Sequence, residues 1–82
     1  MRKRLHRLLA PRRVRKNVAN VLQLRFEDSV LHSDDEPSVV YLDNTKEWYQ
    51  NGRLHRDNGP AIEYSDGRKE WYKEGKFVKS EK

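Results

Sequence analysis

The stretch KEWYQNGRLHRDNGPAIEYSDGRKEWYKEG, residues 46–75, contains Lys-Glu-Trp-Tyr twice, at 46–49 and again at 69–72. Residues 25–47 align on residues 48–70 with the same 23-residue period, and eight positions are then identical. They are Leu31/Leu54, His32/His55, Asp34/Asp57, Pro37/Pro60, Tyr41/Tyr64, Asp43/Asp66, Lys46/Lys69 and Glu47/Glu70. A third copy begins at Trp71 and covers half a unit. Two and a half units of fixed period are typical of a repeat architecture.

Each unit has the pattern of short antiparallel strands. Tight turns are indicated at Asn51-Gly52, Asn58-Gly59 and Asp66-Gly67, and more weakly at Glu74-Gly75, because Asn, Asp and Gly tolerate a positive φ. Between the turns, apolar and polar residues alternate. We therefore predict a mainly β fold, an antiparallel single-layer repeat meander, with strands near residues 22–27, 30–32, 38–42, 46–50, 53–55, 61–64, 68–73 and 76–78.

The first unit departs from the others at three turn positions, at one of which Ser29 stands where the second unit has Gly52. Asn44 stands where the second unit has Gly67, and Glu36 stands where it has Gly59. Asn can adopt a positive φ, so we expect Asn44 to replace the glycine. Glu36 cannot do so easily, and we expect its turn to have another shape.

The N-terminal segment differs from the repeats in charge. Residues 1–25 carry nine Lys and Arg and no acidic residue, whereas residues 26–82 have a net charge of −4. The spacing of Val14, Val18, Val21 and Leu22 predicts a helix over about residues 12–20, with Pro11 in its first turn. We expect a basic N-terminal arm or helix over 1–20, a β-repeat module over 21–79 and a tail over 80–82. If the helix packs, it should cap an end or a face of the sheet.

Composition limits the class of protein. Eighty-two residues with 34% apolar and 38% charged side chains allow one small domain with a thin core. The absence of Cys excludes disulfides and thiolate metal ligands. No apolar run approaches the roughly 20 residues of a membrane span. We expect a soluble cytoplasmic protein without a cofactor, a metal or a membrane span.

The string WYQNGRLHRDNGPA (48–61), followed by Asp66-Gly67 and a second Trp71-Tyr72, resembles the MORN-like repeats of bacteriophage and giant-virus proteins. Some bacterial relatives of that family carry a toxin–antitoxin label. The resemblance covers about residues 25–79 and is closest over 46–77. It implies a β-repeat module that serves as a scaffold or binding surface in a small phage accessory protein acting in the host cytoplasm, and it implies no common reaction.

His55 and Asp57 could act as a catalytic base and its orienting carboxylate. His32 and Asp34 occupy the same places one unit earlier, however, and a residue that recurs with the scaffold period usually serves the scaffold. His can bridge a turn, and Asp can bond its own backbone two residues on. A metal site on His32 and His55 lacks further ligands. We therefore predict that the protein is not an enzyme.

The tandem aromatic residues could form a partner surface. Exposed rings stack on single-stranded bases, at roughly 1–3 kcal/mol for each base. The thin core competes for the same rings, so at most one set is expected to be free. The candidate surface comprises Trp48, Tyr49, His55, Arg56, Trp71 and Tyr72.

The basic arm is the strongest functional lead. Its candidate contact residues are Arg2, Lys3, Arg4, Arg7, Arg12, Arg13, Arg15 and Lys16. Arg pairs bidentately with phosphates and stacks on bases. Nucleic acid or a nucleoprotein is therefore the first choice of partner; an acidic protein groove, a membrane surface or organelle address, and plain solubility are the alternatives. The function expected is a non-enzymatic binding module, and the alternative is a phage-type inhibitor or antitoxin that binds an acidic host protein through its aromatic and loop surface.

Overall fold

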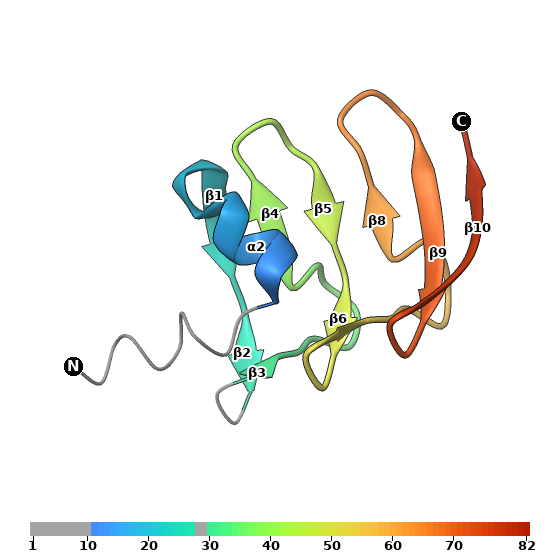
Figure 1. Cartoon of the computed structure of the whole chain (residues 1–82), viewed down its shortest axis with the longest axis horizontal. Coiled ribbons are helices and arrows are strands. Elements are labelled where there is room, and N and C mark those ends of the chain that lie inside the picture. Colours follow the sequence, from blue (N-terminus) through green and yellow to red (C-terminus); the bar gives the residue numbers. More distant parts are fainter. Residues whose placement is uncertain (1–10, 28–29) are drawn as a thin grey trace.

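The computed structural model describes residues 11–27 and 30–82. One short helix, α2, is followed by a 3-10 turn, η1, and then by strands alone (Figure 1). The elements are α2 (Arg12–Lys16), η1 (Val18–Asn20), β1 (Val21–Leu24), β2 (Phe26–Glu27), β3 (Val30–Leu31), β4 (Val39–Tyr41), β5 (Lys46–Glu47), β6 (Tyr49–Gln50), β7 (Arg53–Leu54), β8 (Ile62–Glu63), β9 (Lys69–Lys73) and β10 (Lys76–Glu81).

The strands form one six-stranded sheet and two separate hairpins. The order in the sheet, β1-β4-β5-β8-β9-β10, follows the chain, and every neighbouring pair is antiparallel. The hairpins β2–β3 and β6–β7 lie beside each other along one end of this sheet (Figure 1). The predicted class, mainly β and antiparallel, is confirmed.

Apart from shifts of one residue at strand ends, the structure departs from the prediction at four places. The strands expected at 22–27 and 46–50 are each interrupted, at Arg25 and at Trp48, where the chain passes from the large sheet into a hairpin. The α-helix ends at Lys16 rather than at residue 20, and η1 follows it. The expected tail at 80–82 is wrong, because β10 continues to Glu81 and pairs with β9.

The period of the sequence recurs in the strand register. Phe26 pairs with Leu31, Tyr49 with Leu54 and Tyr72 with Phe77, each pair one repeat unit after the last. Bonds between units repeat as well. The Gly52 N–H donates to the Leu31 carbonyl at 2.9 Å, and the Gly75 N–H donates to the Leu54 carbonyl at 2.8 Å. Each unit therefore contacts the next in the same way.

The turns explain two of the departures in the first unit. Asn44 has a φ of 76° and its counterpart Gly67 has a φ of 96°, so the expected replacement of Gly by Asn is confirmed. Gly59, in contrast, is not among the residues with positive φ. Its lack of a side chain makes room for Arg56 instead, because a Cβ on Gly59 would lie 3.1 Å from the Arg56 guanidinium. The positive φ expected for this turn is therefore wrong.

The core lies between α2 and the first two units. Val14, on the inner side of α2, is 1% exposed and packs in a cluster of buried residues. The other members are Leu31, Val39, Tyr41 and Tyr49. The helix thus covers one face of the β layer beside β1 and β4 (Figure 1), as expected if it packed. Neither of the short helical segments in the described residues has the length or apolar character to cross a membrane.

Candidate functional site

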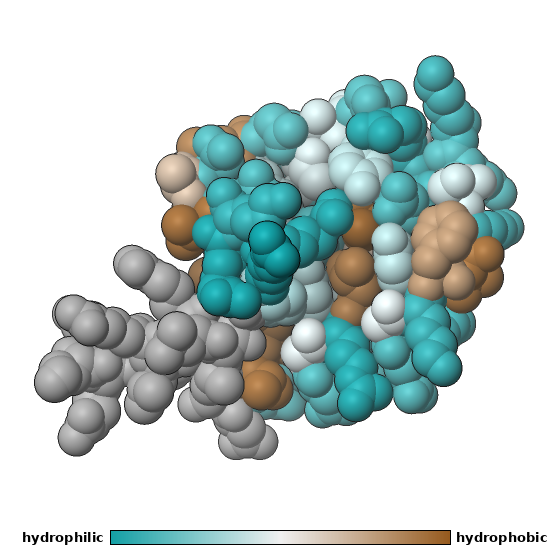
Figure 2. All heavy atoms as spheres, viewed as in Figure 1, coloured by the Kyte–Doolittle hydropathy of each residue, from teal (hydrophilic) through white to brown (hydrophobic). Residues whose placement is uncertain are grey.

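The basic residues of α2 point in two directions. Arg13 is directed inward and its Nε donates to the Oε2 of Glu47 on β5, 34 residues away in the chain. Arg12, Arg15 and Lys16 are exposed. These three residues have the i, i+3, i+4 spacing that places side chains on one helix face. Figure 2 shows a hydrophilic surface over this part of the molecule.

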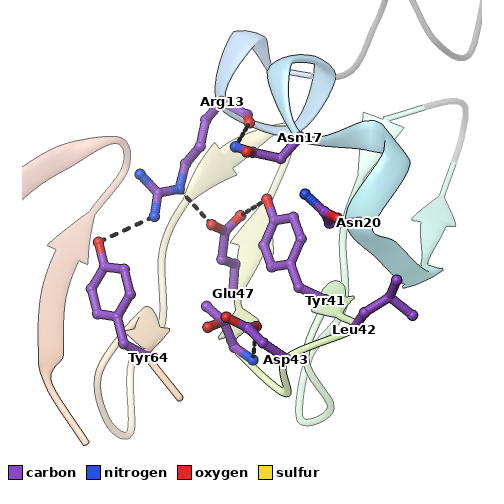
Figure 3. A pocket seen from close by; sticks show the side chains of 9 residues that line it. Arg13, Asn17, Asn20, Tyr41, Leu42, Asp43, Glu47 and Tyr64 are labelled. Carbon is purple, nitrogen blue, oxygen red and sulfur yellow. Dashed lines mark hydrogen bonds and ion pairs between the residues drawn. The ribbon is translucent and has the colours of Figure 1, made fainter. Parts of the chain in front are cut away.

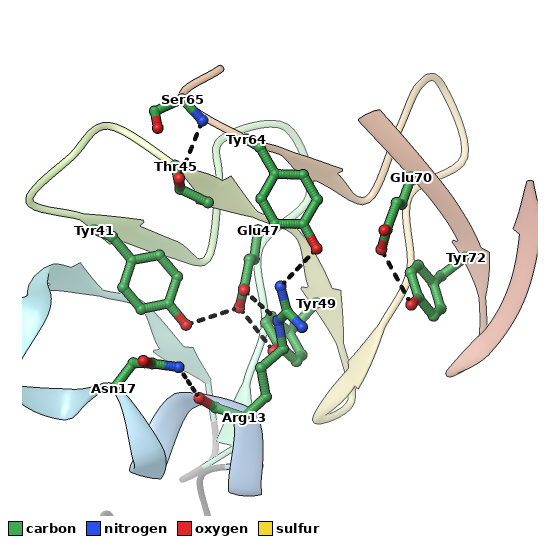
Figure 4. Close-up of polar contacts among 10 residues, drawn as sticks. All are labelled: Arg13, Asn17, Tyr41, Thr45, Glu47, Tyr49, Tyr64, Ser65, Glu70 and Tyr72. Atoms are coloured by element: carbon green, nitrogen blue, oxygen red, sulfur yellow. Dashed lines mark hydrogen bonds and ion pairs between the residues drawn. The ribbon is translucent and has the colours of Figure 1, made fainter. Parts of the chain in front are cut away.

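Glu47 is the centre of a buried polar cluster and is itself only 1% exposed (Figures 3 and 4). Besides Arg13, it accepts hydrogen bonds from the hydroxyl of Tyr41 at 3.2 Å and of Tyr49 at 2.9 Å. The Nη2 of Arg13 also donates to the hydroxyl of Tyr64 at 3.2 Å. A buried carboxylate is tolerated only when it is paired and hydrogen-bonded, and this one is both.

The cluster shifts the proton affinities of its members. Burial alone would lower the pKa of Arg13, but the charge and hydrogen bond of Glu47 outweigh it and raise that pKa. Burial raises the pKa of both Tyr41 and Tyr49, and the negative charge of Glu47 raises it further. The cluster therefore keeps Arg13 charged and both phenols neutral at physiological pH.

Arg13 was expected to bind an external partner, and the structure corrects that expectation. Its guanidinium is already engaged by Glu47 and Tyr64, so it fixes α2 to β5. Arg2, Lys3, Arg4 and Arg7 lie outside the described residues. Among the described members of the predicted contact set, Arg12, Arg15 and Lys16 remain on the surface.

A recess of about 440 Å³ opens beside the polar cluster (Figure 3). It lies between α2, η1 and the turn that joins β4 to β5. Arg13, Asn17, Asn20, Tyr41, Leu42, Asp43, Thr45, Glu47 and Tyr64 line it. The Glu47 carboxylate already accepts from three donors there, so it has the environment of a structural anchor rather than of a general base.

The two histidines occupy equivalent places and make equivalent bonds. The Nδ1 of His55 accepts from the backbone N–H of Glu74 at 2.9 Å, and that of His32 accepts from Asn51 at 3.2 Å. The Nε2 of His55 lies 2.9 Å from the Oδ1 of Asp57. Since Nδ1 accepts, the proton of the neutral ring is on Nε2 and is donated to the carboxylate. The Nδ1 of His55 therefore holds the next turn and its Nε2 holds Asp57 of its own unit, a scaffold role of the kind predicted for it.

The aromatic residues are less available than a partner surface requires. Trp48 is 4% exposed and Tyr49 is 1% exposed, so their assignment to a partner surface is wrong. The guanidinium of Arg56 covers the Trp48 ring at 3.8 Å from its centroid. Trp71 and Tyr72 are half-buried. The aromatic pair is therefore buried at Trp48 and Tyr49 but partly accessible at its third-unit counterparts, Trp71 and Tyr72.

Within residues 11–27 and 30–82, no group of three or more His, Cys, Asp or Glu side chains is placed to hold a metal ion. No known protein family, curated protein or solved structure matches the chain. The resemblance to MORN-like repeats stays a prediction that rests on its motif residues.

The buried role of Glu47 was not predicted from the sequence. One signal could have found it, because Leu24 stands one repeat unit before Glu47 and an apolar residue at an equivalent strand position indicates an inward side chain. Glu47 and Tyr49 are also two residues apart, and side chains with this spacing in extended chain lie on the same face, here that of the core. Because Glu47 is charged, it was not considered as a buried residue.

Proposed function

We propose that the protein is a non-enzymatic binding module of the host cytoplasm, in which the basic N-terminal arm engages nucleic acid or a nucleoprotein while the β repeats serve as scaffold. The observation that carries the proposal is the division of α2 into an anchored side and a basic exposed side. Val14 and Arg13 hold the helix to the sheet, and Arg12, Arg15 and Lys16 lie on the outside.

The anchoring supports the proposal on energetic grounds. A basic segment that is fixed to a folded body loses less conformational freedom when it binds than a free segment does. In addition, the first carboxylate of the chain is Glu27, so the arm offers its own cations no acidic neighbour along the sequence. Such a surface attracts phosphates, which release counterions when they are neutralised.

The test is the salt dependence of oligonucleotide binding. The triple variant R12Q/R15Q/K16Q removes three exposed charges, and K69Q/K76Q/K82Q removes three exposed charges from the opposite end of the sheet as a matched control. We expect the first variant to reduce the slope of log K against log salt by about 2 to 3, as three lost phosphate contacts predict. Fluorescence anisotropy on single-stranded and duplex DNA and RNA, over about 50 to 200 mM salt, measures the slope.

Equal slopes for both triple variants would contradict a role for the arm. The full chain should be used throughout, because residues 1–10 contribute Arg2, Lys3, Arg4 and Arg7. Thermal unfolding of each variant shows whether α2 is still docked.

The second candidate function, an inhibitor or antitoxin that binds a host protein, is favoured by a different observation. Phe77 and Val78 on β10 are 58% and 54% exposed, next to the half-buried Trp71 and Tyr72. Large exposed apolar side chains that adjoin one another mark protein interaction sites. This surface lies in the third unit, away from α2.

A further inference from the structure

Among the strands of residues 11–27 and 30–82, β10 is the last of the six-stranded sheet, and no strand pairs with its outer edge. At the end of the first unit, β5 pairs with β8, which is in turn covered by β9. At the end of the second unit, Glu70 and Lys69 of β9, which are the counterparts of Glu47 and Lys46 on β5, pair with Ser80 and Glu81 of β10. The place of the next strand is therefore taken by β10 itself, and the outer backbone groups of β10 face away from the sheet.

The side chains of this edge combine exposed apolar groups with lysines. All six residues of β10 are exposed. The Phe77 ring packs edge-on against Tyr72 at a centroid distance of 5.6 Å, which fixes its orientation at the surface. Figure 2 shows hydrophobic residues next to hydrophilic ones at this end of the molecule. An extended partner would thus find both backbone groups and a preformed apolar contact.

The charge of the edge selects among possible strands. The hairpin of β9 and β10, with the residue after it, has five lysines and three glutamates. They are Lys69, Lys73, Lys76, Lys79 and Lys82, and Glu70, Glu74 and Glu81. Lysines on an edge strand discourage indiscriminate pairing with other strands. Lys73 and Lys79 already pair with Asp57 and Glu81, so Lys69, Lys76 and Lys82 contribute most of the attraction for a strand that carries carboxylates.

Lys79 is already held in an extended arrangement along this edge. Its Nζ lies 4.6 Å from the centroid of the Trp71 ring and 3.3 Å from the Oε2 of Glu81. In the second unit, Arg56 occupies the equivalent place over Trp48. The cation is therefore positioned by the repeat, and an incoming carboxylate would share it with Glu81.

We infer that the β10 edge binds an acidic peptide segment in extended conformation, which adds a strand to the sheet, and that Phe77 and Val78 contact an apolar side chain of that segment. Strand addition uses backbone hydrogen bonds for affinity and alternate side chains for specificity. The surface is distinct from the arm, so this inference does not depend on nucleic-acid binding.

The experiment uses the full chain and three short capped peptides. The first alternates Glu and Val, the second replaces each Glu by Lys, and the third is the Glu-Val peptide with alternate backbone nitrogens methylated. Amide NMR shifts of residues 76–81 and of the Trp71 indole N–H report the site. We expect only the unmethylated acidic peptide to shift these signals and to slow amide exchange along β10.

Two charge-reversal variants separate this edge from the arm. K76E/K79E should weaken the acidic peptide about tenfold and admit the basic one, as expected for two exposed charge pairs that become repulsive. R12E/K16E, with the same change of net charge, should leave peptide binding unchanged.

The inference is overturned if the peptide shifts signals of α2 rather than of β10, or if the methylated peptide binds equally well. It is also overturned if the free chain dimerises through β10, or if an oligonucleotide rather than the peptide shifts the β10 signals. Loss of oligonucleotide binding in R12E/K16E with intact peptide binding would uphold both proposals, so the failure of one is distinguishable from the failure of the other.

Discussion

The imidazole Nδ1 of His55 accepts a 2.9 Å hydrogen bond from the backbone N–H of Glu74, in the turn of the following unit. The bond joins two consecutive units, and its counterpart between His32 and Asn51 lies one unit earlier. A His in this place acts as a side-chain anchor for a turn whose residues have positive φ.

Replacing the histidine should therefore loosen the junction between units. We expect His55→Ala to lower the free energy of unfolding by about 1 kcal/mol, the usual net contribution of one hydrogen bond. Urea denaturation followed by fluorescence measures the change. His55→Asn, whose amide oxygen can accept the same N–H, is the matched control and should show only part of the loss; equal losses in both would show that the bond contributes nothing.

The turn residue itself offers a stabilising change. Glu74 has a φ of 49°, a conformation that Asn and Gly adopt more readily than other residues. Asn51 fills the equivalent position with a φ of 53°. We expect Glu74→Asn to raise the free energy of unfolding by about 0.5 to 1 kcal/mol. The reciprocal Asn51→Glu should lower it by a similar amount, and a thermal unfolding series that moves both variants in the same direction would contradict this account.

The buried cluster around Glu47 predicts a strongly coupled pair of mutations. Glu47→Leu leaves Arg13 without its carboxylate and should cost about 3 kcal/mol, near the lower end for a broken buried pair because Arg13 is 36% exposed. The double variant R13M/E47L should recover much of this loss, since Leu24 already fills the equivalent position one period earlier. Denaturant unfolding of a double-mutant cycle measures the coupling, and additive losses would contradict it.

Alkaline titration should separate the tyrosines. The pKa of Tyr41 and Tyr49 is raised by burial and by Glu47, so both should remain neutral at about pH 11, where an exposed tyrosine with a pKa of about 10 is mostly ionised. Because the folded pKa is the higher one, the stability they contribute is complete below about pH 10 and is lost as the pH rises further. Tyrosinate absorbance gives the titration. Tyr49→Phe should remove one late step, and a single step for all the tyrosines would show that the cluster is open to solvent.

Low pH should destabilise the fold in part by protonating the turn carboxylate Asp57. The hydrogen bond from His55, followed by that from Lys73, lowers the pKa of Asp57. A lowered folded pKa contributes stability that is present above the unfolded value of about 3.9 and is lost as the pH falls through the folded value. We expect Asp57→Asn, which keeps a hydrogen-bond acceptor, to flatten the dependence of Tm on pH below about pH 4. Identical pH profiles for the two chains would exclude Asp57 as a source of acid sensitivity.

The fold was largely predictable because its hydrogen bonds recur with the period of its sequence. His32 makes the bond that His55 makes one unit later, and Asn44 adopts the positive φ of Gly67, so aligned copies disclosed most strands and turns. The interruptions at Arg25 and Trp48 were not predictable, because the alternation of apolar and polar residues continues through both positions. The strands are divided there by the neighbours with which they pair, in the large sheet before each residue and in a hairpin after it.

The site was less predictable than the fold. Arg12 and Arg13 are chemically identical in the sequence, and only the position of Glu47, 34 residues away, directs one inward. Likewise, Trp48 and Trp71 share a motif, yet a complete unit buries the first and the end of the sheet leaves the second half-buried. The orientation and burial of these side chains depend on residues distant in the sequence and on position within the sheet, neither of which the repeated motif specifies.

The identical junctions between units have a consequence for the length of the molecule. Because the bonds of Leu31 and His32 to one turn match those of Leu54 and His55 to the next, residues 48–70 carry the turn bonds that one unit makes to its neighbours. A chain in which this segment is duplicated in tandem would repeat these turn bonds at the new junction, while Arg13 would still pair with Glu47 alone. The number of units, and with it the length of the β layer, could therefore increase while α2 stays beside β1 and β4 and β10 remains the outer strand.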